Sequence, residues 1–352
     1  MSDNEELEDP QQQIRIDEAA LDAYLKKELP DYAGGLIVRQ FRGGQSNPTF
    51  MLESGDTRYV LRKKPGGTLL KSAHMVDREY RVMTALRDTD VPVPRTYCMC
   101  EDDSVLGTMF FVMEYLPGRL FWDQALPDLQ PAQRAACYDE KNRVLAALHS
   151  VDPVAVGLGD YGKHGEYIAR QVHRWSKQYI AAKTSDVPEM DRLMEWLPGH
   201  IPALDLTCLV HGDFRFDNMM FHPTEPRVLG ILDWELSTLG HPFSDLAYDL
   251  LRYHLPAEDG KSLADRAGDS GIPTEAAYVA DYCRRRGLDA IPDYGFYMAF
   301  SLFRLASIVQ GVYRRGLDGN ASSPEALAGG ENCRLYAQRA VAMLEQDESY
   351  EF

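Results

Sequence analysis

The spacing of apolar residues divides the chain into a β-rich part and a helical part. Short apolar stretches bounded by turn residues, which are typical of strands, lie at 36–41, 49–54, 59–64, 95–100 and 107–115. Between the third and the fourth stretch, apolar residues recur every three or four positions over about 73–88. This periodicity predicts one amphipathic helix beside a small sheet.

The Leu-Pro-Gly sequence at 116–118 marks a change of pattern. Helical periodicity then dominates, at about 131–150, 165–183, 189–197, 242–254, 274–286, 292–315 and 331–347. The exception is a pair of apolar stretches, 219–221 and 228–233, joined by the turn-rich segment HPTEPR, which predicts a β-hairpin.

These patterns predict an α+β protein with two lobes. We expect a small β-rich N-lobe with one key helix at 15–115 and a larger, mainly helical C-lobe at 116–352. The acidic, polar segment 1–14 is expected to be a disordered tail.

Composition and charge exclude some classes of function. The 352 residues are 45% hydrophobic and carry a formal net charge of −17, which opposes nucleic acid as the main partner. The long apolar segment 294–313 has Arg304 in its middle, so it predicts a buried helix and not a membrane span. The beginning of the chain lacks the pattern of a signal peptide. The six cysteines lack the spacing of a zinc site, and reduced thiols fit a cytoplasmic protein.

A concentration of polar and charged residues interrupts the apolar pattern at 211–218, which we call the polar loop. Its sequence, HGDFRFDN, lies between the apolar stretches LTCLV and MMF. Phosphoryl transfer to an alcohol needs a carboxylate to orient the hydroxyl, oxygen ligands for Mg²⁺, and cations near the phosphates. Asp213 is the candidate base, Asn218 a candidate metal ligand, and Arg215 a candidate contact of the γ-phosphate.

A second acid follows at the end of the predicted hairpin. Asp233 comes directly after the apolar stretch VLGIL. A hairpin between 218 and 233 would return Asp233 to the neighbourhood of Asn218, so that both could share one metal ion. The sequence therefore predicts a magnesium site made of these two residues.

Together these segments resemble a known family. H-G-D-F-R-F-D-N matches the H-x-D-x-[K/R]-x-x-N loop of the protein-kinase-like superfamily, and ILDW at 231–234 matches its metal-binding aspartate. With GHPFSDLAYDL at 240–250, the chain resembles the aminoglycoside phosphotransferase family from about 36 to 320, in particular the branch fused to acyl-CoA dehydrogenases. The resemblance implies a bilobal kinase-like fold that uses ATP and Mg²⁺. It also implies that His211 is a structural residue of the loop and does not transfer a proton.

The resemblance predicts the roles of specific residues in the N-lobe. The third strand should end in a cation for the nucleotide phosphates, and Arg62 in YVLR holds the position of the lysine in the protein-kinase motif V-A-I-K. Lys64 stays an alternative. This cation should pair with an acid on the next helix, for which Glu79 is the candidate.

Two further N-lobe segments should bind the nucleotide. The loop RGGQSNP at 42–48 should cover the phosphates, and the end of the strand FFVMEY should hold adenine through backbone groups. The residues concerned are Gly43, Gly44, Ser46 and Asn47 in the loop, and Met113, Glu114 and Leu116 near the strand end.

Other features separate the chain from protein kinases. Gly212 replaces the arginine that receives an activation-loop phosphate, and Asp233 is followed by Trp-Glu instead of Phe-Gly. Asp245 starts a predicted helix, where it is either a plain N-terminal acid or a hydrogen-bond acceptor for the backbone of the polar loop. We therefore expect a small-molecule kinase that needs no activation loop.

The acceptor is the least defined element. Its expected binding residues are Arg304, Gln310, Tyr313 and Arg314, although a structural ion pair is an equal alternative for Arg304. Three hypotheses remain: a kinase for a hydroxyl group on a hydroxyacyl-CoA-type metabolite, an aminoglycoside O-phosphotransferase, and a nucleotide-binding regulator without catalysis. We expect ATP and a small molecule as partners, with neither nucleic acid nor membrane.

Overall fold

The computed structural model describes residues 7–8, 16–41, 47–66, 75–257, 259–319, 327 and 329–346. Contacts divide the chain into two compact units. The first comprises Met1–Trp122, Val156–Leu158 and Phe216–Ser237, and the second comprises Asp123–Ala155, Gly159–Arg215 and Thr238–Phe352. The hairpin segment 216–237, which the sequence analysis placed in the C-lobe, therefore makes its contacts with the first unit.

The first unit is built on an antiparallel sheet. In the described residues it has six strands in the order β1-β2-β3-β4-β6-β5. Their bounds are Leu7–Glu8 for β1, Ile37–Phe41 for β2, Thr49–Ser54 for β3, Thr57–Lys63 for β4, Thr96–Cys100 for β5 and Phe110–Glu114 for β6. The last five confirm the predicted strands. β1 lies within the segment expected to be disordered, because two residues are too few to give a periodic signal.

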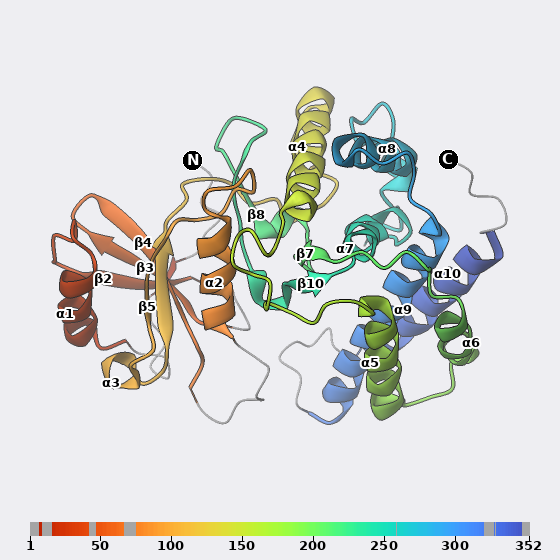
Figure 1. Ribbon diagram of the computed structural model, residues 1–352, viewed down its shortest axis with the longest axis horizontal. Helices are drawn as coiled ribbons and strands as arrows, with labels where there is room; N and C mark the ends of the chain where they lie inside the picture. Colours follow the sequence, from red (N-terminus) through yellow and green to blue (C-terminus); the bar gives the residue numbers. More distant parts are fainter. Residues whose placement is uncertain are drawn as a thin grey trace. The chain divides into compact units, whose positions relative to one another are not determined.

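Two helices cover opposite faces of this sheet (Figure 1). α2 (Val76–Leu86) confirms the predicted helix, and its Tyr80 ring lies 6.0 Å from the ring of Phe111 on β6. α1 (Glu18–Glu28) covers the other face, where Tyr24 meets Phe110 edge to face at 5.4 Å. α1 was not predicted from the apolar spacing, and the short helix α3 (Asp103–Leu106) lies where a turn was expected.

The predicted hairpin is present. β8 (Met219–Phe221) pairs with β9 (Val228–Ile231), and the N–H of Leu232 donates to the carbonyl of Asn218 at 2.8 Å. Its base packs on the segment after β6, because the Phe121 ring meets the rings of Phe216 and Phe221 at 6.2 and 5.2 Å. The hairpin thus brings residues 218 and 233 to one end of the first unit.

We expect Gly118→Ala to destabilise the first unit. A Cβ atom at Gly118 would lie 2.3 Å from the carbonyl oxygen of Phe221 and 2.6 Å from Cγ of Met220. Relieving such overlap requires a backbone shift, which costs about 1–3 kcal/mol of unfolding free energy. Thermal unfolding measures the effect. Gly66→Ala is the control, since its Cβ would meet nothing within 4 Å, and equal melting temperatures for the two variants would contradict the expectation.

The second unit is mainly helical. The predicted helices are confirmed as α4 (Pro131–Ser150), α5 (Tyr167–Ala182), α6 (Pro188–Trp196), α7 (Pro242–Asp249), α8 (Glu275–Arg286), α9 (Tyr294–Leu317) and α10 (Gly329–Gln346). A short antiparallel pair that was not predicted, β7 (Cys208–Val210) with β10 (Thr238–Gly240), lies among them. The remaining turns of 3-10 helix are Leu197–Gly199, Phe216–Asn218, Trp234–Leu236, Leu250–Tyr253 and Ala264–Arg266.

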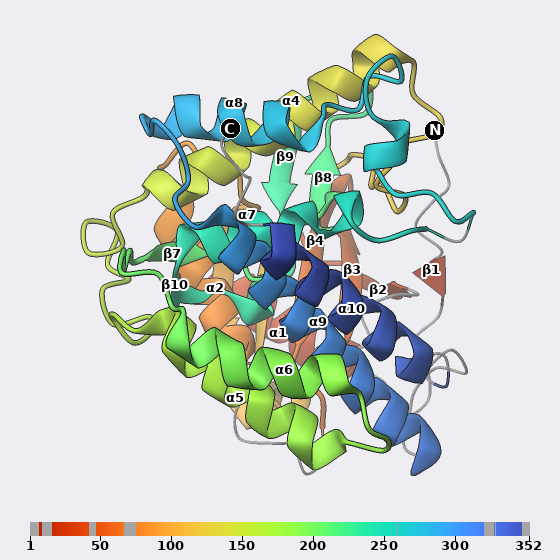
Figure 2. The same ribbon diagram turned by 90° about the vertical axis from the view of Figure 1, so that its right-hand side faces the viewer.

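Helix α9 forms the centre of the second unit. It contacts α5, α7 and α10, and Figure 2 shows it running beside α10. By length and composition alone α9 would be able to cross a membrane, but 72% of its most apolar window is buried inside the protein. The prediction of a buried helix at 294–313 is therefore confirmed.

Candidate functional site

The polar loop begins where β7 ends, and an acid from α7 holds its backbone. The Asp245 carboxylate accepts hydrogen bonds from the N–H groups of His211 and Gly212, each at 2.8 Å. Gly212 adopts φ +84°, a conformation that favours glycine. The expected bond from Asp245 to the loop backbone is thus confirmed, and it fixes the chain just before Asp213.

The same carboxylate is tied to two other helices. Nε2 of His149 on α4 lies 3.2 Å from Asp245, and Nδ1 of His149 lies 2.7 Å from the hydroxyl of Tyr282 on α8. Burial would raise the pKa of Asp245, but the hydrogen bonds from His149 and the His211 backbone outweigh it and lower that pKa. Burial lowers the pKa of His149. A neutral histidine and an ionised aspartate therefore anchor the polar loop.

Asp213 and Arg215 lie side by side on the loop. Nε of Arg215 is 3.2 Å from Oδ1 of Asp213, and both side chains are partly exposed. The N–H of Asp213 donates to Nδ1 of His211, which is fully buried, in keeping with a structural His211. The arginine predicted to contact a γ-phosphate thus pairs with the predicted base in this structure. Because its side chain is partly exposed, Asp213 is accessible to a hydroxyl group of a substrate.

In the first unit, Arg62 joins two acids. Its Nη2 lies 2.7 Å from Oδ1 of Asp233, and its Nε lies 3.2 Å from Oε2 of Glu79. Burial would lower the pKa of Arg62, but Glu79 and Asp233 outweigh it and raise that pKa. Burial raises the pKa of Glu79 to about 7, although Arg62 opposes the shift. The predicted pair of Arg62 with Glu79 is confirmed, and no ion pair is found for the alternative, Lys64, among the described residues.

Asp233 has a strained backbone. Its φ and ψ are both 61°, in the left-handed region that is costly for a residue other than glycine. The hydrogen bond between Leu232 and Asn218 places Asp233 next to Asn218 along the hairpin, as predicted. Strain of this kind concentrates at functional sites, so it singles out Asp233 within the hairpin.

These residues suit a magnesium ion that also binds phosphate. Mg²⁺ prefers one or two carboxylates, with the remaining positions taken by water and phosphate oxygens. Asp233 and Asn218 supply such oxygens, and Glu79, Asp233 and Glu235 together place three acids near the single guanidinium of Arg62. No three or more His, Cys, Asp and Glu side chains in the described ranges are arranged so that they could hold a metal ion by themselves.

The residues predicted to bind the nucleotide phosphates from the loop at 42–48 are only partly described, and one of them has a different role. Gly43, Gly44 and Ser46 lie outside the described residues. Asn47, predicted to face the phosphates, is fully buried and donates from Nδ2 to Oε1 of Glu79 at 3.1 Å. Its amide therefore supports the ion pair of Glu79. Sequence reasoning missed this role because the pairing spans 32 residues.

The segment predicted to hold adenine begins at the end of β6. Met113 is buried, and the N–H of Glu114 donates to the carbonyl of Arg95 at 2.8 Å, so this N–H is occupied. The backbone of Leu116 has no hydrogen bond within the described parts of the chain. Its backbone groups are thus free for the predicted contact with adenine, which stays a prediction.

Of the four residues predicted to bind the acceptor, Arg304 contacts the polar loop. Its Nη2 donates to the carbonyl of Gly212 at 2.9 Å, and its guanidinium lies 4.1 Å above the centre of the Tyr248 ring and 5.6 Å from that of Trp175. Arg304 is 8% exposed, and its Nε has no hydrogen-bond partner. Among the described residues it has no carboxylate partner, so the alternative of a structural ion pair is not observed.

The other three candidates have structural contacts. Gln310 is buried and donates to the carbonyl of Ala182 and to Oγ1 of Thr184. Arg314 forms an exposed ion pair with Asp318 at 3.0 Å. Tyr313 packs against the backbone at the start of α10. A role in acceptor binding has no support from these contacts.

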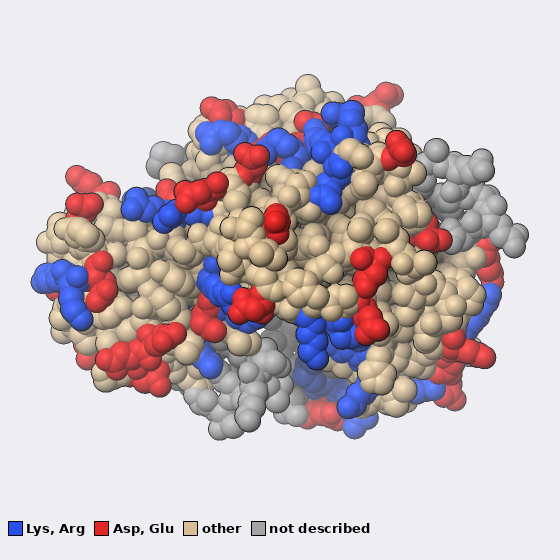
Figure 3. Space-filling model, in the orientation of Figure 1, with Lys and Arg blue, Asp and Glu red and all other residues tan. Residues whose placement is uncertain are grey.

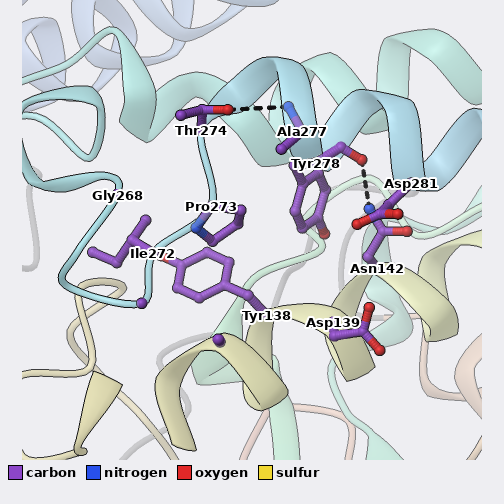
Figure 4. A pocket seen from close by; sticks show the side chains of 12 residues that line it. Tyr138, Asp139, Asn142, Gly268, Ile272, Pro273, Thr274, Ala277, Tyr278 and Asp281 are labelled. Carbon is purple, nitrogen blue, oxygen red and sulfur yellow. Dashed lines mark hydrogen bonds between the residues drawn. The ribbon is translucent and has the colours of Figure 1, made fainter. Parts of the chain in front are cut away.

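A pocket that no sequence pattern indicated lies elsewhere in the second unit. Its volume is about 460 Å³, and Figure 4 shows it between α4, α8 and the loop at 268–274. Tyr138 and Tyr278 form its aromatic wall, and Nδ2 of Asn142 donates to the carbonyl of Tyr278 at 2.8 Å. None of the predicted site residues lines it.

Comparison with known proteins identifies the family. The model of the phosphotransferase enzyme family matches residues 37–289. Acyl-CoA dehydrogenase family member 10 of Mus musculus is 49% identical over 331 residues, which are 93% of this chain and 31% of that protein. A crystal structure from Ralstonia eutropha, provisionally named an aminoglycoside phosphotransferase, is 50% identical with a TM-score of 0.88 and covers 94% of this chain and 99% of that one.

A more distant structure shares the fold. The aminoglycoside phosphotransferase APH(4)-Ia, solved in a ternary complex with ADP and hygromycin B, has a TM-score of 0.59 at 13% identity and covers 95% of this chain and 100% of its own. The predicted kinase-like fold is confirmed, as is the resemblance to the branch fused to acyl-CoA dehydrogenases. The chain spans about a third of the length of its mouse relative. This chain belongs to the phosphotransferase enzyme family.

Proposed function

We propose that this phosphotransferase is a small-molecule kinase that transfers the terminal phosphoryl group of ATP to a hydroxyl group of an anionic, hydroxyacyl-CoA-type metabolite. In the first unit, Arg62 would hold nucleotide phosphates, and Asp233 with Asn218 would hold the metal. Bound Mg²⁺ would neutralise charge on the phosphates. In the second unit, Asp213 would orient the hydroxyl and accept its proton while Arg215 offsets negative charge.

The observation that supports an anionic acceptor is the environment of Arg304. A buried arginine is costly unless an anion compensates its charge. Arg304 bonds the carbonyl one residue before Asp213 and has no carboxylate partner among the described residues. A negatively charged group of the acceptor would supply the missing partner close to the base.

A second arginine lies near Trp175, whose ring also lies near Arg304. Arg174 lies over the Trp175 ring at 5.3 Å, on the helix that contacts α9. Arg174 is exposed, as is Lys177 one turn later, and neither has an ion pair with any residue the structure describes. Figure 3 shows Lys and Arg side chains gathered near α5 and the end of α9. Unpaired cations in a chain of net charge −17 suit the phosphates of a CoA-type acceptor.

The alternative acceptor is an aminoglycoside, which the names of the Ralstonia eutropha protein and of APH(4)-Ia favour. Aminoglycosides are polycations, so their binding residues should be mostly acidic. Arg304, Arg174 and Lys177 argue against such an acceptor. A regulator without catalysis is a third alternative, but it has no need of Asp213, Asn218 and Asp233, which are all present.

An acceptor screen tests this function. The protein is incubated with Mg²⁺ and ATP and with two panels, hydroxyacyl-CoAs and aminoglycosides, and mass spectrometry detects phosphorylated products. We expect a phosphorylated hydroxyacyl-CoA. A phosphorylated aminoglycoside would reverse the assignment, and bound ATP without any product would favour the regulator.

We expect Arg304→Met to weaken binding of the acceptor more than binding of the nucleotide. Losing a charge-assisted hydrogen bond costs about 1.5–3 kcal/mol, so the acceptor KM should rise roughly tenfold to a hundredfold. Steady-state kinetics with the acceptor found in the screen measures both KM values. Arg192→Met, which removes an exposed arginine paired with Glu345, is the control. Equal changes in the two KM values would return Arg304 to a structural role.

A further inference from the structure

Arg62 forms an ion pair with Asp233, the acid that is predicted to bind the metal ion. The contact between its Nη2 and Oδ1 of Asp233 is 2.7 Å long, and the Arg62 side chain is 12% exposed. Such a short, charge-assisted bond between a guanidinium and a carboxylate is among the stronger polar contacts in proteins. A metal ion that needs this oxygen must therefore displace the arginine first.

The position of Arg62 is fixed from several sides. β4 lies between β3 and β6, so the backbone of Arg62 pairs with Thr49 on one side and Phe111 on the other. Glu79 forms an ion pair with Nε of the same guanidinium, and Asn47 in turn donates a hydrogen bond to Glu79. An arginine fork contacts two acids at once, whereas a lysine presents a single ammonium group.

A free divalent cation is expected to bind only weakly to Asp233. The guanidinium next to Asp233 repels a second cation. Mg²⁺ also loses its water shell reluctantly and usually binds to proteins together with substrate phosphates. A phosphate removes both obstacles to metal binding. It attracts the guanidinium away from Asp233, and it offers oxygen ligands that replace water on the metal.

We propose that Arg62 is the specificity-determining residue of the Asp233 site, and that it excludes free metal ions and admits only metal that binds together with a phosphate. In this scheme the phosphate draws the Arg62 fork away from Asp233 and frees Oδ1 for the metal. The second half of the scheme rests on the proposed function, because it assumes that Arg62 binds nucleotide phosphate. The first half, exclusion of free metal, depends on the contact between Arg62 and Asp233 alone.

Binding of Mn²⁺ without nucleotide tests the exclusion. Electron paramagnetic resonance measures free Mn²⁺ during titration of the wild-type protein, Arg62→Met, and Arg62→Met combined with Asp233→Asn. We expect Arg62→Met to bind Mn²⁺ roughly tenfold to a hundredfold more tightly than the wild type, the factor that corresponds to one charge-assisted hydrogen bond. The double variant should lose this gain. Arg58→Met, which removes a more exposed arginine from the same strand, should bind as the wild type does.

Two results would overturn the proposal. One is equal Mn²⁺ affinity of the wild type and Arg62→Met, and the other is a gain that persists in the double variant. Circular dichroism checks folding, and if Arg62→Met fails to fold, Arg62→Lys replaces it, with an expected gain of at least a few fold because the fork is lost.

Titration with ADP separates this proposal from the proposed function. In the wild type, ADP should tighten Mn²⁺ binding beyond the affinity of ADP for Mn²⁺ in solution, and in Arg62→Met this extra tightening should disappear. A wild type that excludes Mn²⁺ through Arg62 but never binds ADP would refute the kinase assignment and leave the exclusion intact. If ADP still gave this extra tightening of Mn²⁺ binding in Arg62→Met, the proposed movement of Arg62 from Asp233 to the phosphate would be wrong.

Discussion

Asp213→Asn is expected to lower kcat for phosphoryl transfer by about 10²–10⁴-fold, the usual contribution of a positioned general base. Asparagine keeps the size of the side chain but cannot accept the proton of the acceptor hydroxyl. The loop itself should keep its shape, because Asp245 holds the N–H groups of His211 and Gly212 independently of the Asp213 side chain. Nucleotide affinity should therefore change little.

Steady-state kinetics and calorimetric nucleotide titration measure these two quantities separately. Asp128→Asn makes the same chemical change at an exposed position without a described partner and is the matched control. Unchanged turnover in Asp213→Asn would remove Asp213 from the role of base. A parallel loss of nucleotide affinity and turnover would mean that the substitution disturbs the loop as a whole.

Asp233→Ala is expected to abolish the dependence of nucleotide binding on Mg²⁺. Removing one ligand of a metal that has few protein ligands should weaken binding of a Mg²⁺-bound, non-hydrolysable ATP analogue by about a hundredfold, because losing even an outer-shell partner of a metal ligand costs about 10–100-fold in affinity. Arg62 would keep Glu79 as its partner, so the first unit should still fold. Affinity for the analogue without metal should change much less.

Isothermal titration with and without Mg²⁺ gives both affinities, and a melting curve checks folding. Asp56→Asn, an exposed change in the turn between β3 and β4, is the control. If the Mg²⁺-dependent gain in affinity survived in Asp233→Ala, the metal assignment would be wrong.

The parts of this molecule that depend on local pattern were predicted well. The hairpin at 219–231 and the helix α2 follow from apolar spacing and turn residues, and the position of Asp233 after β9 follows from the hairpin. The bond from Asp245 to the polar loop was one of two readings, since a helix N-terminal acid has two ordinary uses. The resemblance to a family supplied the roles of residues that spacing alone leaves open.

Contacts between distant segments were not predictable in the same way. Asn47 looked like a phosphate-loop donor, but its partner Glu79 lies on a separate helix. Gln310 and Arg314 were predicted to bind the acceptor, yet Gln310 contacts the end of α5 and Arg314 pairs with Asp318. The contact of Arg62 with Asp233 joins residues 171 positions apart, and no periodicity encodes it.

If this chain moves a phosphoryl group with Asp213 as base and Asp233 as metal ligand, transfer must depend on both carboxylates. The most direct measurement is single-turnover transfer of an isotope-labelled terminal phosphate from ATP to the acceptor found in the screen. We predict rapid, Mg²⁺-dependent transfer by the wild type and almost none by Asp213→Asn or Asp233→Ala. Transfer at the wild-type rate by either variant would show that the substituted carboxylate does not have the proposed role.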